Sequence, residues 1–268
     1  MGIAWFDGDP VEMEALELRS GGLPLLTEST PWPACPRCDA PLLFRAQIPL
    51  AMTSLLSPLD ERTMMLFECH AETEGTLCDG AAAVLSTGEC APRQPPAAQA
   101  FDVFLDEAGP NPEDVAGILG RLAGEDARWP AAGQIVARGI PAAMAEQTVR
   151  ILEEAGARIV LRESPPTTLA SVNGALLMPF DDGVDGASRT TLPALGGLVG
   201  SSKRRMRGLI GGATAGYRDH SFTCTCGKPT RTIARLLAVS DAGVELAPAV
   251  AQLCLACGRA HYHRTGAR

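Results

Sequence analysis

Cys224-Thr225-Cys226-Gly227 and Cys254-Leu255-Ala256-Cys257-Gly258 decide how the end of this chain folds. Two cysteines separated by one or two residues bracket a tight turn whose backbone N–H groups point toward the sulfurs. A glycine after the second cysteine tolerates the positive φ that such a turn needs. Two such pairs from separate segments close a tetrahedral thiolate cage, which is coordinatively full and therefore structural. The spacing predicts a zinc site made by Cys224, Cys226, Cys254 and Cys257.

The start of the chain carries a related pattern, Cys35-Pro36-Arg37-Cys38-Asp39, in which Asp39 takes the place of the glycine. The closing cysteines, Cys69 and Cys78, are separated by eight residues, and His70 is an alternative to Cys69 as a ligand. The pattern predicts a second structural zinc site from Cys35, Cys38, Cys69 and Cys78. The competing interpretation is a remnant site whose cysteines remain as small core residues.

The two ends of the chain also share features beyond the cysteines. Gly21-Gly22 precedes the first cysteine pair by 13 residues, and Gly211-Gly212 precedes its counterpart by 12. Each copy then runs through a strand-like segment before its second pair of cysteines. We interpret the ends as divergent copies of one zinc-ribbon unit. The predicted fold class is α+β, with two β-rich zinc-ribbon-like units flanking a small βααβαβ domain. The predicted boundaries are 1–95, 96–163 and 164–268, set by the Pro-rich segments 91–96 and 163–166.

The middle third follows a helix and strand pattern of its own. The sequence predicts a short strand over 101–105 and a helix that begins at Pro112, with an apolar stripe of Val115, Ile118, Leu119 and Leu122. A weaker helix is predicted over 131–138, and another after Pro141. The inward residues of that last helix are predicted to be Met144, Thr148, Ile151 and Leu152. Ala155-Gly156 ends it, and a strand is predicted over 158–161.

The segments FDVFLDEAGPNPEDVAGIL and VRILEEAGARIVL resemble the C-terminal domain of the bacterial ribosomal stalk protein over about 60 residues. That resemblance implies a compact βααβαβ unit that docks translation GTPases through a basic helix. This chain departs from the family in the docking helix, because it has Glu113, Asp114, Gly117 and Gly120 where the family has lysines, with Arg121 almost alone. The resemblance therefore implies a shared fold rather than a shared docking surface.

The first third is similar to the programmed cell death protein 2 family. The motifs that carry the similarity are Gly-Gly-x-Pro, then Cys-x-x-Cys-x-x-Pro-Leu-x-Phe-x-x-Gln, Pro58-Leu59-Asp60 and Phe67-Glu68-Cys69. The family consists of eukaryotic cytosolic zinc-site proteins implicated in escorting a small-subunit ribosomal protein. The similarity implies a binding role and identifies no catalytic residue.

Composition and charge narrow the function classes. The 268 residues are 46% hydrophobic and 20% charged, which suits a buried core and excludes a wholly disordered chain. The charge balance is −9 over 1–95, −5 over 96–163 and +6 over 164–268, so nucleic-acid affinity is expected only from the last third. Its dense basic cluster is Lys203, Arg204, Arg205 and Arg207, a candidate contact for RNA phosphate or an acidic partner. The favoured alternative for this cluster is a solvated loop that only offsets acidic neighbours. Neither a signal sequence nor a membrane span is predicted, and we expect a cytoplasmic protein.

Several other residues have a functional and a plain interpretation. Cys90 is expected to be an unpaired thiol. His261 and His263 alternate on one side of a predicted strand, which suits a second metal or, more commonly, an exposed strand face. Asp181 to Gly186 resembles the start of a calcium loop but has Leu192 at the closing position, so an acidic turn is favoured.

No catalytic constellation is found in the sequence. It lacks Gly-x-Ser-x-Gly, His-Glu-x-x-His and dinucleotide-binding patterns, and its zinc sites are predicted to be full. We therefore expect a non-catalytic zinc protein that binds a protein partner, ribosomal or translation-associated, as a client escort or by factor docking. The alternatives are an immunity or antitoxin protein that masks a basic toxin, and an RNA-binding zinc-ribbon protein. No membrane partner is expected.

Overall fold

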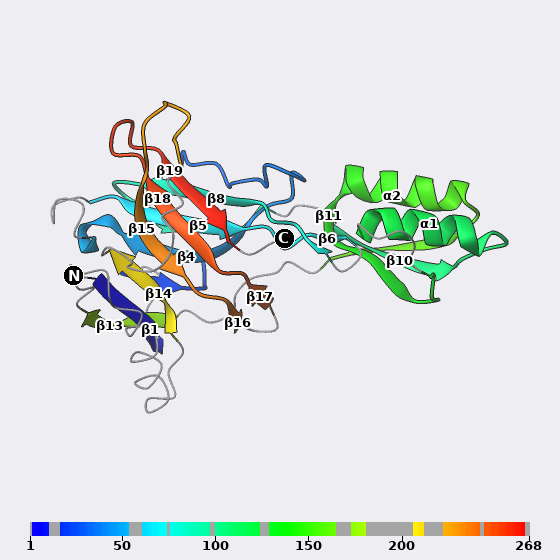
Figure 1. Ribbon diagram of the computed structural model, residues 1–268, viewed down its shortest axis with the longest axis horizontal. Coiled ribbons are helices and arrows are strands. Elements are labelled where there is room, and N and C mark those ends of the chain that lie inside the picture. The colour runs from blue at the N-terminus through cyan, green and yellow to red at the C-terminus, as the bar shows by residue number, and fades with distance from the viewer. Residues whose placement is uncertain are drawn as a thin grey trace.

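The computed structural model describes residues 2–10, 17–53, 61–73, 76–96, 100–123, 129–164, 173–180, 206–211, 222–241 and 244–265. Strands from both ends of the chain build one β-rich body, and a smaller unit with the two helices of these residues projects from it (Figure 1). The coarse prediction of a mixed, mostly β, α+β protein is confirmed. None of the described helices has the length and apolar character needed to cross a membrane.

A ten-stranded sheet forms the body, with the order β19-β18-β15-β14-β1-β13-β2-β4-β5-β8. The strands of its N-terminal half are β2 (Arg19–Ser20), β4 (Leu43–Pro49), β5 (Thr63–Glu68) and β8 (Ala81–Ser86). Those of its C-terminal half are β14 (Met206–Gly211), β15 (Arg231–Leu236), β18 (Ala249–Leu253) and β19 (Ala260–Arg264). A short 3₁₀ turn, η1 (Leu50–Met52), follows β4. The halves therefore occupy opposite ends of one sheet.

Strand pairing follows the same register in both halves. On β4 and β5, Leu43 pairs with Glu68, Phe44 with Phe67 and Ala46 with Leu66. On β15 and β18, Arg231 pairs with Leu253, Thr232 with Gln252 and Ala234 with Ala251. Each pairing thus contains a β-bulge at the corresponding position, Arg45 in one half and Ile233 in the other.

The centre of the sheet interleaves the two ends of the chain. Strand β1 (Gly2–Pro10) pairs with β14 on one side and with β13 (Asn173–Phe180) on the other. Strand β13 in turn pairs with β2. The first strand of the chain consequently lies among strands from the last hundred residues, with Trp5 buried in the core.

Strands β4 and β5 are buried on both faces because different layers cover them. Met65 and Phe67 pack into a core shared with the helical unit, whereas Met64 and Leu66 pack into a core shared with the C-terminal half. Successive strand residues point to opposite faces, so one run of apolar residues serves both cores. Strand β19 lies against β8 and β5, which brings the two halves together.

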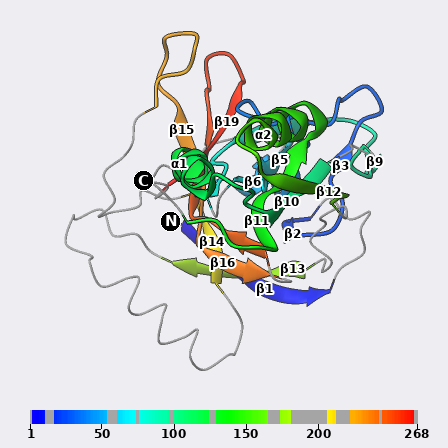
Figure 2. The same ribbon diagram turned by 90° about the vertical axis from the view of Figure 1, so that its right-hand side faces the viewer.

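The projecting unit is a three-stranded sheet covered by two helices. Its elements are β10 (Ala100–Glu107), α1 (Pro112–Ala123), β11 (Gln134–Pro141), α2 (Ala142–Glu154) and β12 (Arg158–Glu163). Strand β10 is central and antiparallel to both neighbours. Both helices lie on the same side of the sheet (Figure 2). The predicted apolar stripe of α1 is confirmed, with Val115 and Leu119 buried.

Two predictions for this unit are wrong. The helix predicted over 131–138 is strand β11, so the described unit is βαβαβ rather than βααβαβ. The β-branched pair Ile135-Val136 favours a strand, and Val136 is buried against the helices while Ile135 is only half-buried. Ile151, predicted to face inward, is exposed, because Ala145, Thr148 and Leu152 form the buried side of α2.

A hairpin from the first unit extends this second sheet. Strand β6 (Glu72–Thr73) pairs with β11 and with β7 (Thr76–Leu77), giving the order β12-β10-β11-β6-β7. Two further small pairs join β3 (Leu25–Leu26) to β9 (Ala91–Pro92) and β16 (Val239–Asp241) to β17 (Val244–Leu246). The projecting unit is therefore held to the body by main-chain hydrogen bonds as well as by a common core.

Candidate metal centres

The four N-terminal cysteines converge on one point. The sulfurs of Cys35, Cys38, Cys69 and Cys78 lie within 4.8 Å of one another. The closest pairs are Cys35 with Cys78 at 3.6 Å and Cys38 with Cys69 at 3.5 Å. A tetrahedral ion with metal–sulfur bonds of about 2.3 Å needs sulfurs about 3.8 Å apart. The four thiols therefore fit a metal ion. Cys69, and not His70, belongs to this group.

The four C-terminal cysteines form a second group of the same kind. Their sulfurs also lie within 4.8 Å of one another, with Cys224 3.6 Å from Cys257 and Cys226 3.5 Å from Cys254. All eight cysteines predicted as ligands are thus assembled as two groups of four, and each group can hold one metal ion. In both groups, the closest sulfurs join the two different loops, so a bound ion would fasten the loops together.

Three of the four cysteine turns have the backbone that the sequence predicts. The residue after the second cysteine has a φ of 57° at Asp39, 79° at Gly227 and 72° at Gly258. In each turn, the backbone N–H of this residue donates to the carbonyl of the first cysteine, over 2.8 to 3.0 Å. Non-glycine residues rarely adopt this conformation, and Asp is among those that tolerate it best. These local hydrogen bonds therefore help to fix where the sulfurs lie.

The fourth pair of cysteines, Cys69 and Cys78, is not joined by a tight turn, because the β6–β7 hairpin lies between them in the sequence. The N–H of Cys69 donates to the carbonyl of Gly80 over 2.8 Å, and the N–H of Cys78 donates to the carbonyl of Ala71 over the same distance. These bonds keep the two cysteines side by side at the base of the hairpin while its tip reaches β11. The long spacing between Cys69 and Cys78 thus allows both residues to join the sulfur group while the hairpin between them attaches the helical unit.

The N-terminal group is enclosed. Cys35 and Cys69 are buried, Cys38 and Cys78 are half-buried, and a Cβ on Gly80 would lie only 2.2 Å from the Cys35 sulfur. Nη1 of Arg264, on β19 of the other half, donates to the carbonyls of Cys69 and Cys78 over 3.4 and 2.5 Å.

Burial lowers the pKa of the neighbouring His70 to about 4, so its ring is neutral near pH 7.

The C-terminal group is open by comparison. Cys224 and Cys254 are buried, but Cys226 and Cys257 are exposed. Their two loops project side by side at the top of Figure 1, in amber and red. Nε2 of His261 lies 3.3 Å from the Cys224 sulfur. The backbone N–H of Cys226, with help from His261 and Cys257, lowers the pKa of the Cys224 thiol to about 5, which favours the thiolate that a metal needs.

Sequence reasoning missed a buried polar cluster between the two halves. Arg45 forms an ion pair with Glu68, and both contact the Tyr262 hydroxyl. Arg45 also donates to the carbonyls of Leu237 and Ala247 over 2.7 and 2.6 Å. The β-bulge makes Arg45 the extra residue of its strand, and its guanidinium reaches across to the C-terminal half. No spacing signal marked these residues, because a lone Arg in a strand is ordinarily half-exposed.

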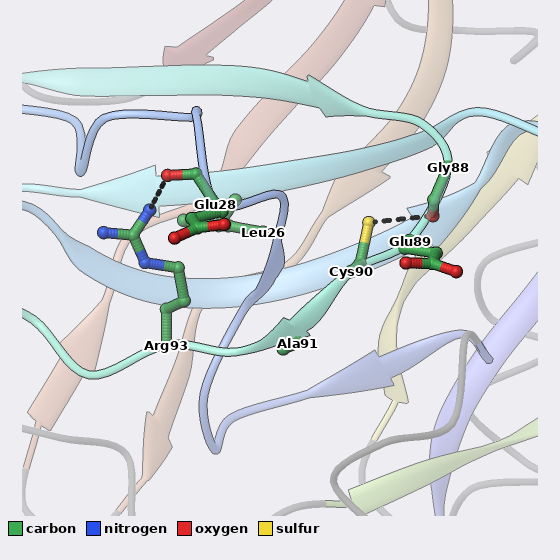
Figure 3. Close-up of a pocket in the computed structure, with 7 residues that line it drawn as sticks. All are labelled: Leu26, Glu28, Gly88, Glu89, Cys90, Ala91 and Arg93. Atoms are coloured by element: carbon green, nitrogen blue, oxygen red, sulfur yellow. Dashed lines mark hydrogen bonds between the residues drawn. The ribbon is translucent and has the colours of Figure 1, made fainter.

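The other candidate residues stand apart from the two metal centres. Cys90 borders a hollow of about 850 Å³ that is also lined by Glu28, Glu89 and Arg93 (Figure 3). Its sulfur contacts Ser86 Oγ at 3.0 Å and the Gly88 carbonyl at 3.3 Å, and the described lining holds no imidazole that would activate it. Lys203, Arg204, Arg205 and the segment 181–186 lie outside the described residues, and Arg207 is placed only as part of β14.

Comparison with known proteins supplies no relative on which to base a function. Neither the protein-family models, nor the curated proteins, nor the solved structures gave a match. The function of the chain therefore has to be argued from the two metal centres and their surroundings.

Proposed function

We propose that this protein is a non-catalytic zinc-binding module for protein–protein interaction, built from two copies of a zinc-ribbon-like unit. The observation that carries the proposal is the assembly of eight cysteines into two sets of four sulfurs. Thiolate sets of this kind suit zinc, and a cage with four protein ligands leaves no position for a reacting water. The shared register and the matching bulges at Arg45 and Ile233 support descent from one unit.

The helical unit is the part proposed to meet the partner. Trp129 is 69% exposed and Leu161 is 40% exposed on this unit. Exposed apolar side chains of this size are a common feature of protein interfaces. Because the unit is anchored to a metal centre through β6, its position on the body would be set by the bound ion. We propose a ribosomal or translation-associated protein as the partner, by analogy with the resemblances described above.

Two measurements test this function. Elemental analysis of the purified protein is expected to give two zinc ions per chain, and fewer than two would overturn the architecture. Affinity purification at endogenous level, followed by mass spectrometry, is expected to recover ribosomal proteins. Recovery of a single basic toxin would instead establish an immunity role. Recovery of RNA in a salt-dependent manner, lost when residues 203–207 are neutralised, would establish RNA binding.

A further inference from the structure

His261 stands beside the C-terminal sulfur group without belonging to it. The four cysteine sulfurs alone lie within 4.8 Å of one another, while Nε2 of His261 is 3.3 Å from the Cys224 sulfur. The centre thus has five donor atoms for the four positions of a tetrahedral ion. An imidazole nitrogen is a preferred zinc ligand, and structural sites use sets of three cysteines and one histidine as well as sets of four cysteines.

A stack of rings fixes the place of this imidazole. The His261 ring stacks on His263, with 6.1 Å between centroids and 9° between planes. His263 in turn stacks on Phe222, two residues before Cys224, at 4.1 Å and 12°. The ring is therefore held next to the first cysteine turn by Phe222, which precedes that turn, and by His263 on β19. Neighbouring groups of this kind fix the orientation of metal-binding imidazoles.

The matching position in the N-terminal half is occupied by alanine. In β18 and β19, Gln252 pairs with His261, and the corresponding pair in β5 and β8 is Phe67 with Ala82. That half also has the enclosed centre, whereas the half with His261 has the two exposed cysteines. The fifth donor is thus present where a sulfur ligand is accessible from solvent.

We propose that His261 is a reserve ligand that makes the C-terminal centre a metal-exchange site. This inference rests on the zinc sites of the proposed function. When an exposed cysteine, Cys226 or Cys257, leaves the ion, Nε2 of His261 occupies the vacated position and the ion stays four-coordinate. The metal–sulfur bond breaks with its electron pair on sulfur, and the lone pair of Nε2 forms the new bond. The ring binds as a neutral imidazole with its single proton on Nδ1, and the departing thiolate takes a proton from water.

The consequence is a centre with two ligand sets. With four thiolates, a divalent ion gives a net charge of −2, and with three thiolates and a neutral imidazole it gives −1. In the second set the exposed cysteine has left the ion, so a donor atom of the acceptor can approach the ion from solvent while His261 keeps it four-coordinate. The acceptor class is a molecule with its own thiolate or imidazole donors. The enclosed N-terminal centre would keep its ion during such an exchange.

Metal counting by native mass spectrometry tests the reserve ligand. We expect Cys226→Ala to retain two zinc ions and Cys226→Ala/His261→Ala to retain one. The matched control is Cys38→Ala, which removes the corresponding cysteine from the half with Ala82 and is expected to retain one. In the cobalt-substituted protein, Cys226→Ala should lose one thiolate's share of the charge-transfer absorption and shift its ligand-field bands to shorter wavelength. Loss of one zinc ion from Cys226→Ala would overturn the proposal, as would retention of two by Cys38→Ala.

A second measurement keeps all eight cysteines of the two centres in place and uses the Cys90→Ala background, which removes the thiol outside them. Iodoacetamide, whose iodide is displaced by a thiolate sulfur, is then expected to alkylate Cys226 or Cys257 first. Singly alkylated Cys90→Ala should still hold two zinc ions, while singly alkylated Cys90→Ala/His261→Ala should hold one. Equal metal loss from both proteins would refute the role of His261. A wild-type protein with fewer than two zinc ions before treatment would refute the proposed function itself, so the two failures are distinguishable.

Discussion

The N-terminal and C-terminal centres have the same four donors but different surroundings. Around the first, Gly80, Arg264 and the β6–β7 hairpin close the space about the sulfurs. In the C-terminal centre, Cys226 and Cys257 are exposed, and the His261 ring lies beside the Cys224 sulfur. The comparison teaches that cysteine spacing brings the four sulfurs together, while the packing around them would decide how readily a bound ion exchanges.

Removal of a buried sulfur should have the largest effect. Cys35→Ala takes a ligand from the enclosed centre and leaves a gap in the core shared with the helical unit. Structural zinc contributes about 10–16 kcal/mol of binding free energy, which is comparable with the whole stability of a domain, about 5–15 kcal/mol. We expect Cys35→Ala to lose the ion of its centre and to unfold at a much lower urea concentration than wild type, whereas Cys226→Ala stays close to wild type. Circular dichroism and urea unfolding check this, and Cys90→Ala is the control that should leave both unchanged.

Loss of the buried ion pair between Arg45 on β4 and Glu68 on β5 should have the next largest effect. Arg45→Met leaves the Glu68 carboxylate buried without its partner, and such changes destabilise by about 3–5 kcal/mol. Because Glu68 directly precedes Cys69, we expect faster zinc release from the N-terminal centre and no change at the other. Denaturant unfolding and chelator kinetics measure the two effects. The double variant Arg45→Met/Glu68→Leu should recover most of the stability, and a double variant as unstable as the single one would contradict the explanation.

Two glycines offer a direct comparison of how tightly the centres are packed. A Cβ at Gly80 would meet the Cys35 sulfur at 2.2 Å, whereas a Cβ at Gly227 would meet no atom within 4 Å. Overpacking costs about 1–3 kcal/mol, so Gly80→Ala should weaken zinc binding at its centre by about 10- to 100-fold. Gly227→Ala should cost only the strain of a positive φ, about 1 kcal/mol. Competition with a zinc chelator measures both, and equal losses would mean that the N-terminal centre is not closely packed.

The smallest effect is expected from an ion pair across the N-terminal centre. Nε of Arg37 lies 2.6 Å from the Asp79 carboxylate, and both side chains are largely exposed. Exposed ion pairs contribute about 0–1 kcal/mol. Asp79→Asn should therefore leave zinc affinity within about five-fold of wild type and reduce the effect of salt on it. A much larger loss would show that the charge pair, rather than the packing at Gly80, closes this centre.

The parts predicted well from sequence are those set by local chemistry. Asp39, Gly227 and Gly258 each have the positive φ that their place after a cysteine pair requires. The apolar stripe of α1 was likewise readable, since its spacing follows the turn of a helix. Such features depend on a few neighbouring residues, and a single sequence contains all of them.

The features that the sequence predicted badly are those whose structure depends on contacts between distant segments of the chain. Gln134–Pro141 is a strand because β10 and β6 pair with it on its two sides, which overrides a weak helical pattern. The spacing of Cys69 and Cys78 makes sense only once the hairpin between them is seen against β11. Arg45 is buried because a bulge and the C-terminal half meet it, and neither is visible in its neighbours.

The place of β1 has a consequence for synthesis of the protein. Its partners β13 and β14 end at Phe180 and Gly211, so a nascent chain cannot complete its central sheet until most of it has been made. At about 5–20 residues per second, the first strand waits about 10–40 s with both edges unpaired. Exposed strand edges invite pairing with other chains. Protection of the first ten residues during synthesis is therefore expected to raise the yield of folded protein.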